Sequence, residues 1–163
     1  LRCLVGSEMC IRDRLYIDAL VNSINKKINE ISWKPDLIIA SYHGIPKKYF
    51  DKGDPYHCYC HKTTRLISEK FSSIKIKTTF QSRFGPQEWL QPYTDKTLEN
   101  LPKEGVKNVL TICPGFASDC VETLEEIQIQ AKESFLNSGG ENFDMVPCLN
   151  DNSDHIILSL IHI

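Results

Sequence analysis

The sequence predicts a single α/β domain with a mainly parallel sheet covered by helices on both faces. Helical and strand-like patterns alternate along the chain, as crossover connections between parallel strands require. Short continuous apolar runs such as residues 37–42 are typical of strands buried on both faces. The 163 residues suffice for one domain and leave little room for a second.

The predicted elements follow one another in a repeated order. Apolar residues at helical spacing predict a first helix from Ile17 to about Ser32, and Pro35 and Asp36 separate it from the first strand. The same rhythm recurs three times. Further helices are predicted at 62–72, 95–101 and 118–138, and strands at 37–42, 75–80, 108–113 and 143–149.

Composition excludes several classes of protein. The chain has 19 Lys and Arg and 21 Asp and Glu, which gives a formal net charge of -2. This charge provides no general electrostatic attraction to nucleic acid. The longest apolar runs, 37–40 and 156–158, are far shorter than the roughly 18 residues of a membrane span. Seven irregularly spaced cysteines favour a reducing compartment, so we expect a cytoplasmic protein.

The two ends of the chain differ from the rest. The chain begins with Leu1, the string VGSEMCIRDR resembles translated adapter sequence, and the closing LSLIHI is similar. We therefore expect a non-native leader at 1–14, a folded lobe at 15–156 and a non-native tail at 157–163. On this interpretation the chain is a fragment, and Cys3, Cys10 and His162 carry no chemistry.

Three loops are predicted to share one rim of the sheet. Ligands of open parallel sheets bind beyond the carboxyl ends of the strands, here after Tyr42, Phe80 and Cys113. His43 follows the first of these strands, and Gly44 begins the turn after it. This position favours a catalytic or ligand role for His43, although a lone histidine can equally be structural or solvated.

Acidic residues open the long predicted helix. Asp119, Glu122 and Glu126 are spaced i, i+3 and i+7, which would place three carboxylates on one helical face near His43. A capping box with Asp119 or Ser118 as N-cap explains some of this acidity without any function. Three carboxylates together nevertheless require a cation or a proton, so this face suits Fe(II) binding or acid–base chemistry.

The loop 79–90 is the third part of the rim. It offers amide, hydroxyl, guanidinium and aromatic groups that suit a pocket for a flat apolar ligand bearing carboxylates. The alternative is a solvated loop in which Trp89 serves as a packing anchor.

The segment His57–Cys58–Tyr59–Cys60–His61 is dense in metal-ligand types. A structural zinc or iron–sulfur site needs four ligands, usually in two pairs, and no second short-spaced pair occurs. Only the fold could complete such a site, by adding Cys113, Cys120 or Cys148. The alternative is that 57–61 are ordinary loop residues.

The strings SYHGIPKKYFDKGDPY, TTRL, TTFQSRFGPQEWLQPYTD and CPGFASDCVETLEEI together resemble the ferrochelatase family. The resemblance runs from about Leu15 to His155 and covers the carboxyl-terminal half of the bacterial proteins. Members of this family are lyases of haem biosynthesis that insert ferrous iron into protoporphyrin IX. Their fold has two α/β lobes around a porphyrin cleft, which implies that this chain holds one lobe and lacks the amino-terminal one.

The resemblance assigns roles residue by residue. His43 matches the active-site histidine of the S-x-H-x-x-P motif and Glu122 the glutamate of the S-D-x-x-E-T motif, the family's iron-binding pair. His43 is expected to abstract a proton or bind iron, and Glu122 to bind iron opposite it. Asp119 and Glu126 match the accompanying acidic residues and are expected to pass protons or iron along the helix.

Other positions are less uniform. Ser82 and Trp89 fall in a loop that resembles the porphyrin-facing wall, whereas Cys120 stands where some members carry a second histidine. Some members hold a [2Fe-2S] cluster, but its ligand pattern does not map onto Cys58 and Cys60. The resemblance implies no required cofactor, since Fe(II) is a substrate. An apolar haem product is compatible with peripheral membrane contact.

Two other functions stay open at this point. A related chelatase that inserts cobalt or nickel into another tetrapyrrole would use the same residues. Alternatively, an isolated lobe binds a metal or small acid without turnover, and inactivity is what we expect of this fragment alone.

Overall fold

The computed structural model describes residues 14–161, and the side chains within 14–157. Residues 1–13 and 162–163, with Cys3, Cys10 and His162, lie outside the described residues. The leader predicted at 1–14 and the tail at 157–163 therefore stay predictions. Within the described part of the chain, no helix is long and apolar enough to cross a membrane.

The centre of the fold is a four-stranded, all-parallel sheet with strand order β2-β1-β3-β4. This arrangement confirms the predicted α/β class. Strand β4 ends four residues earlier than predicted: the Val146 N–H still donates to the Thr111 carbonyl oxygen (2.8 Å), but the Cys148 N–H donates to Asp119 instead of to β3. The strands are β1 (Leu37–His43), β2 (Lys75–Gln81), β3 (Asn108–Ile112) and β4 (Asn142–Met145).

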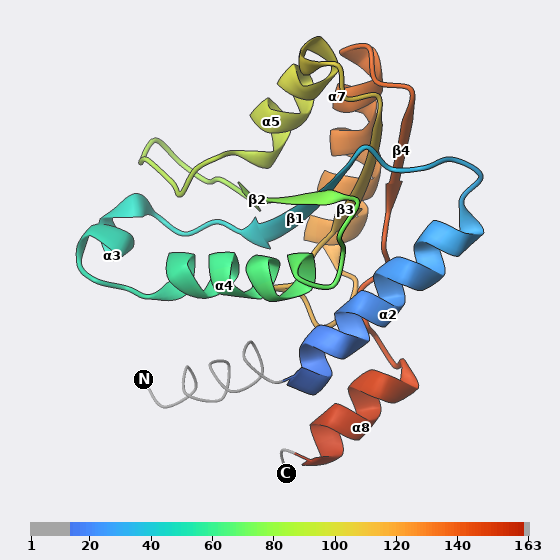
Figure 1. Ribbon diagram of the computed structural model, residues 1–163. Coiled ribbons are helices and arrows are strands. Elements are labelled where there is room, and N and C mark those ends of the chain that lie inside the picture. The colour runs from blue at the N-terminus through green and yellow to red at the C-terminus, as the bar shows by residue number, and fades with distance from the viewer. Residues whose placement is uncertain (1–13, 162–163) are drawn as a thin grey trace.

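Helices lie on both faces of the sheet (Figure 1). One layer contains α2 (Arg14–Glu30) and α4 (Tyr56–Ser68), which contact each other, and α8 (Ser153–Ile161) packs against α2. The other layer contains α5 (Thr94–Asn100), the 3-10 turn η1 (Leu101–Glu104), α6 (Val121–Leu124), the π-helix η2 (Glu126–Ala131) and α7 (Lys132–Asn137). A short helix, α3 (Lys47–Asp51), precedes α4.

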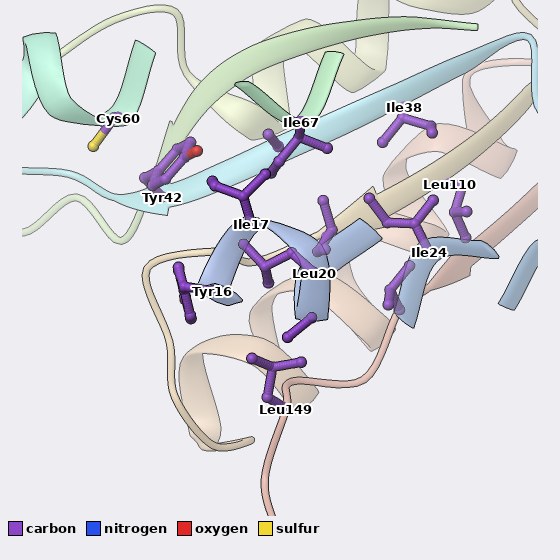
Figure 2. Close-up of a cluster of buried hydrophobic side chains, with 14 of the residues drawn as sticks. Tyr16, Ile17, Leu20, Ile24, Ile38, Tyr42, Cys60, Ile67, Leu110 and Leu149 are labelled. Atoms are coloured by element: carbon purple, nitrogen blue, oxygen red, sulfur yellow. The ribbon is translucent and has the colours of Figure 1, made fainter. Parts of the chain in front are cut away.

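Alternate side chains of the inner strand β1 pack in two separate hydrophobic cores, one on each face of the sheet. Ile38, Ala40 and Tyr42 of β1 pack in the first core with α2 and α4, as Figure 2 shows for part of this cluster. Leu37 and Ile39 pack on the opposite face with α5, η2 and α7. The period of two in a strand produces this division, and it explains why the run 37–42 is apolar without interruption.

Helix α4 begins six residues before the predicted start at residue 62. The prediction that 57–61 are loop residues is therefore wrong. Asp54 accepts a hydrogen bond from the Tyr56 N–H (2.9 Å), and Pro55 precedes the first turn. The apolar face of this first part of α4 is hard to recognise in the sequence. Its buried residue is Cys60, and cysteine is easily taken for a metal ligand instead of a small apolar residue. Helices α3 and α8 were also not predicted.

Gly140 lies just after α7, in close contact with the second core. A Cβ at this position would lie 2.2 Å from Cε1 of the fully buried Phe135 ring. We expect Gly140→Ala to lower the free energy of unfolding by roughly 1–3 kcal/mol, because the ring must shift in a packed core. Urea denaturation measures this loss. In a Phe135→Leu background the same Gly140→Ala change should cost less, and an equal cost in both backgrounds would contradict the steric explanation.

Candidate metal-binding rim

The parallel register brings His43 to the predicted rim. His43 is the last residue of β1 and pairs with Gln81, the last residue of β2. The half-buried imidazole places Nδ1 2.6 Å from the carbonyl oxygen of Gly44. The Tyr56 hydroxyl donates to the His43 carbonyl oxygen (2.9 Å). Helix α4 thus fixes the end of the strand that carries the histidine.

The turn after His43 requires glycine for a steric reason. The Gly44 N–H donates to the Gln81 carbonyl oxygen (2.7 Å), which holds the turn against the neighbouring strand end. A Cβ on Gly44 would lie 2.9 Å from that same oxygen and 3.3 Å from the Trp89 ring. Only glycine allows this close approach of the two backbones.

Gln81 connects the two strand ends to the acidic helix. Its side chain is 2% exposed. Its Oε1 accepts a hydrogen bond from the Ser41 hydroxyl (2.7 Å), and its Nε2 donates to the backbone carbonyl of Glu122 (2.6 Å). The Cys113 thiol also lies 3.7 Å from Oε1. One buried amide therefore joins β1, β2 and the start of α6.

Glu122 lies in α6, on the same rim as His43. Its side chain is partly exposed. The pKa of Glu122 is lowered by its own backbone N–H first, then by the Cys120 thiol, and further by the charge on His43. A lowered pKa favours the carboxylate form, which is the form that binds cations. The structure thus brings together the two residues predicted as an iron-binding pair.

The acidic helix differs from the prediction in where it starts and how it is wound. The first helical residue is Val121, and the capping box is formed by Cys120 and Thr123, with the Thr123 hydroxyl 3.0 Å from the Cys120 N–H. The predicted box with Asp119 or Ser118 and Glu122 is wrong. The helix then widens into the π-helix η2, where Gln130 N–H bonds to the Glu125 carbonyl.

Asp119 precedes the helix rather than sharing its face. One carboxylate oxygen accepts bonds from the Thr123 hydroxyl and the Cys148 N–H, both at 3.2 Å, and the other accepts from the Asn150 amide (2.8 Å). Burial alone would raise the pKa of Asp119, but the bonds from Asn150, Cys148 and Thr123 outweigh burial and lower it. Asp119 therefore ties the helix start to the loop after β4.

Glu126 holds the loop that follows β2. Its two carboxylate oxygens accept hydrogen bonds from the Ser82 N–H (2.6 Å) and the Ser82 hydroxyl (2.5 Å). Ser82 has a φ of 62°, a left-handed conformation that costs energy for a residue with a Cβ. These two bonds stabilise that conformation. A cavity of about 280 Å³ lies beside this contact, lined among others by Arg83, Asp95 and Gln130.

Trp89 is an anchor of the same loop. The side chain is 9% exposed, and its Nε1 donates to the Phe84 carbonyl oxygen (3.0 Å). Its contact with the Gly44 turn places it next to the histidine strand. Packing therefore explains the position of Trp89 in this structure. Phe84, which is 83% exposed, is the solvent-exposed aromatic side chain of the loop.

The cysteines do not assemble around residues 57–61. Cys60 lies in the first core and Cys113 in the second, so the sheet separates them. Burial raises the pKa of the Cys60 thiol to about 12. Among the described residues there is no group of three or more His, Cys, Asp or Glu side chains arranged to hold a metal ion.

Sequence reasoning missed Gln81 and Asn150. Gln81 is polar but directly follows the predicted strand 75–80, and the family resemblance assigns a role to its neighbour Ser82 and none to Gln81. A signal existed, since a polar residue at the end of a buried parallel strand must find buried partners. Asn150 offered no comparable signal, because its partner Asp119 is 31 residues away.

The hydrogen bonds of Asp119 predict a specific pH dependence. Because folding lowers the pKa of Asp119, its stabilising effect is present above the unfolded pKa of about 3.9 and is lost as pH falls through the lower folded pKa. Asp119→Asn should cost about 1–2 kcal/mol of unfolding free energy at pH 7 and progressively less below about pH 4. Urea denaturation at both pH values tests this. The exposed Asp151→Asn is the control, and equal stability of Asp119→Asn and the parent at pH 7 would contradict the role.

Comparisons with known proteins agree on one family. The family model for ferrochelatase matches residues 9–161. The ferrochelatase of Rhizobium meliloti is 60% identical over 144 residues, which cover 87% of this chain and 42% of that protein. The ferrochelatases of Allorhizobium ampelinum (58%, covering 87% and 42%) and Brucella ovis (54%, covering 86% and 40%) are similar.

The chain spans less than half the length of these curated relatives. Within that span, the match includes both the histidine strand and the acidic helix of the rim. The extent of the family match, together with identities above half, shows that this chain belongs to the ferrochelatase family.

Proposed function

We propose that this chain supplies the metal-binding wall of an enzyme that inserts ferrous iron into protoporphyrin IX to form protohaem. The observation that carries the proposal is the placement of His43 and Glu122 on one rim, linked through Gln81. The relatives' name supports iron rather than cobalt or nickel as the metal. The reaction belongs to the lyases of haem biosynthesis, and we place it in the cytoplasm.

The chemistry requires a metal ligand and a base at one place. Insertion removes water from the iron, takes two protons from the pyrrole nitrogens and brings the metal into the ring. Glu122 in its carboxylate form supplies an oxygen ligand for Fe(II), and its lowered pKa keeps this form available. The His43 imidazole either accepts a pyrrole proton or binds the iron opposite Glu122.

We assign accessory roles to Asp119 and Glu126. Both carboxylates accept hydrogen bonds that fix loops next to the pair. Each can pass a proton or an ion only by exchanging these bonds. The main effect of Asp119 is therefore to position the start of the helix that carries Glu122. The main effect of Glu126 is to position the Ser82 loop.

The porphyrin is proposed to lie along the loop that carries Ser82 and Trp89. Glu126 accepts hydrogen bonds from Ser82 of this loop, Trp89 anchors the loop, and Phe84 is exposed. The partners are thus protoporphyrin IX, ferrous iron and the family's amino-terminal lobe. Iron is a substrate in this proposal, and the proposed reaction includes no cofactor.

The central test removes either member of the proposed pair. In a chain of the relatives' full length, His43→Ala and Glu122→Ala should each lower kcat for ferrous insertion by roughly 100-fold or more, because a base or a metal ligand is lost. Stopped-flow or endpoint absorbance of protohaem measures the rate.

The matched control for Glu122 is Glu133→Gln, which changes an exposed carboxylate on α7. It should leave the rate unchanged. Near-normal rates for His43→Ala or Glu122→Ala would refute the assignment. Metal binding without turnover in the unmodified full-length chain would support the alternative of a binding lobe.

Gln81 predicts a second kinetic effect. Gln81→Met keeps the volume of the side chain but leaves the Ser41 hydroxyl and the Glu122 carbonyl without these partners. We expect kcat to fall roughly 10- to 100-fold with a smaller change in the KM for porphyrin, since a displaced ligand affects the reacting geometry. The exposed Gln128→Met is the control. A change in KM alone would indicate that Gln81 does not position Glu122.

A further inference from the structure

Two histidines that the proposed reaction does not use lie one turn apart on α4. His57 and His61 are spaced i, i+4 on a 13-residue helix, so their side chains share one face. Their ring centroids are 4.4 Å apart, and the rings are tilted by 48°. Two histidines at this spacing on a helix are a known arrangement for binding one metal ion.

The imidazole nitrogens of this pair are unused in the described part of the chain. Neither imidazole ring has a hydrogen bond or an ion pair to another described residue. The rings are instead held by aromatic packing. The ring centroid of His57 lies 4.9 Å from that of Phe50 and 5.7 Å from that of Phe80, on which it stacks with an interplanar angle of 21°. The ring centroid of His61 lies 6.3 Å from that of Phe80. Packing therefore fixes the rings and leaves their nitrogens free for a ligand.

The spacing of the rings matches one coordination geometry. With metal–nitrogen distances near 2.1 Å, each ring centre lies about 3.2 Å from the ion, so two adjacent octahedral ligands have centres about 4.5 Å apart and two tetrahedral ligands about 5.2 Å. The observed 4.4 Å fits the octahedral case. Six-coordinate divalent ions that accept imidazole, such as Ni²⁺ and Co²⁺, have this geometry.

We propose that His57 and His61 form a second metal site, which binds a divalent cation of the Ni²⁺ or Co²⁺ type through two imidazole nitrogens. Water completes the coordination, since the residues 14–157 supply no group of three metal-binding side chains. The site goes beyond the proposed insertion reaction and does not depend on it. Cys58 is exposed next to His57 and is the rival ligand that a test must exclude.

The test is Ni²⁺ titration of the full chain by isothermal calorimetry. A His43→Ala/Glu122→Ala background removes the proposed insertion site, so that binding there cannot be confused with binding to α4. We expect this background to bind one Ni²⁺ ion. Adding His57→Gln or His61→Gln should abolish that binding, and Cu²⁺ bound to the same background should show hyperfine coupling to two nitrogens in its electron paramagnetic resonance spectrum.

Two controls keep the result specific. His155→Gln removes a histidine on α8 whose Nδ1 lies 2.7 Å from the Asn150 carbonyl, and it should retain binding. Cys58→Ser should also retain it. Loss of binding in Cys58→Ser, retention in His61→Gln, or no binding in the background would each overturn the proposal. Circular dichroism checks folding, and the exposed His61→Gln decides the question if His57→Gln unfolds.

Discussion

The geometry of the rim depends on one buried amide. Gln81 ends β2, and its two polar atoms contact a β1 hydroxyl and the first turn of the acidic helix. A buried amide without such partners is costly, so these contacts are as much a condition of folding as of function. The Ser41 hydroxyl continues the network to Thr94 at the start of α5. The position of Glu122 relative to His43 therefore depends on a buried contact in the protein interior, in addition to the loops that Asp119 and Glu126 hold.

Much of the fold follows from local patterns in the sequence. The run 37–42 predicts a strand buried on both faces, and β1 occupies it with one residue added. The stripe from Ile17 to Ile31 predicts α2, which ends at Glu30 and whose buried side chains include Ile17, Leu20 and Ile24. These elements are predictable because each buries a regular set of apolar residues, and period alone identifies such a set. Parallel pairing then brings the loops after the strands to one rim.

The rest depends on contacts between residues far apart in the sequence. Asp119 and Ser118 are ordinary N-cap types, yet Cys120 takes that position because Asp119 bonds to Asn150 and Cys148 instead. The π-helix has no local signature either. Its register is compatible with Glu126 reaching Ser82 while the Glu122 carbonyl faces Gln81. For the same reason, His43 and Glu122 could be named from a motif, but Gln81 could be recognised only from the structure.

The bond between Glu126 and Ser82 makes the loop and any ion at that carboxylate mutually dependent. A cation that takes both oxygens of Glu126 displaces the Ser82 N–H and hydroxyl, and Ser82 then loses the support of its left-handed backbone. By thermodynamic linkage, a ligand that stabilises the present loop conformation lowers the ion affinity of Glu126. The bound ion lowers the affinity for that ligand by the same factor. The loop that carries Ser82 and Trp89 thus competes with an ion for the Glu126 carboxylate. Ion binding at Glu126 would therefore change the conformation of this loop.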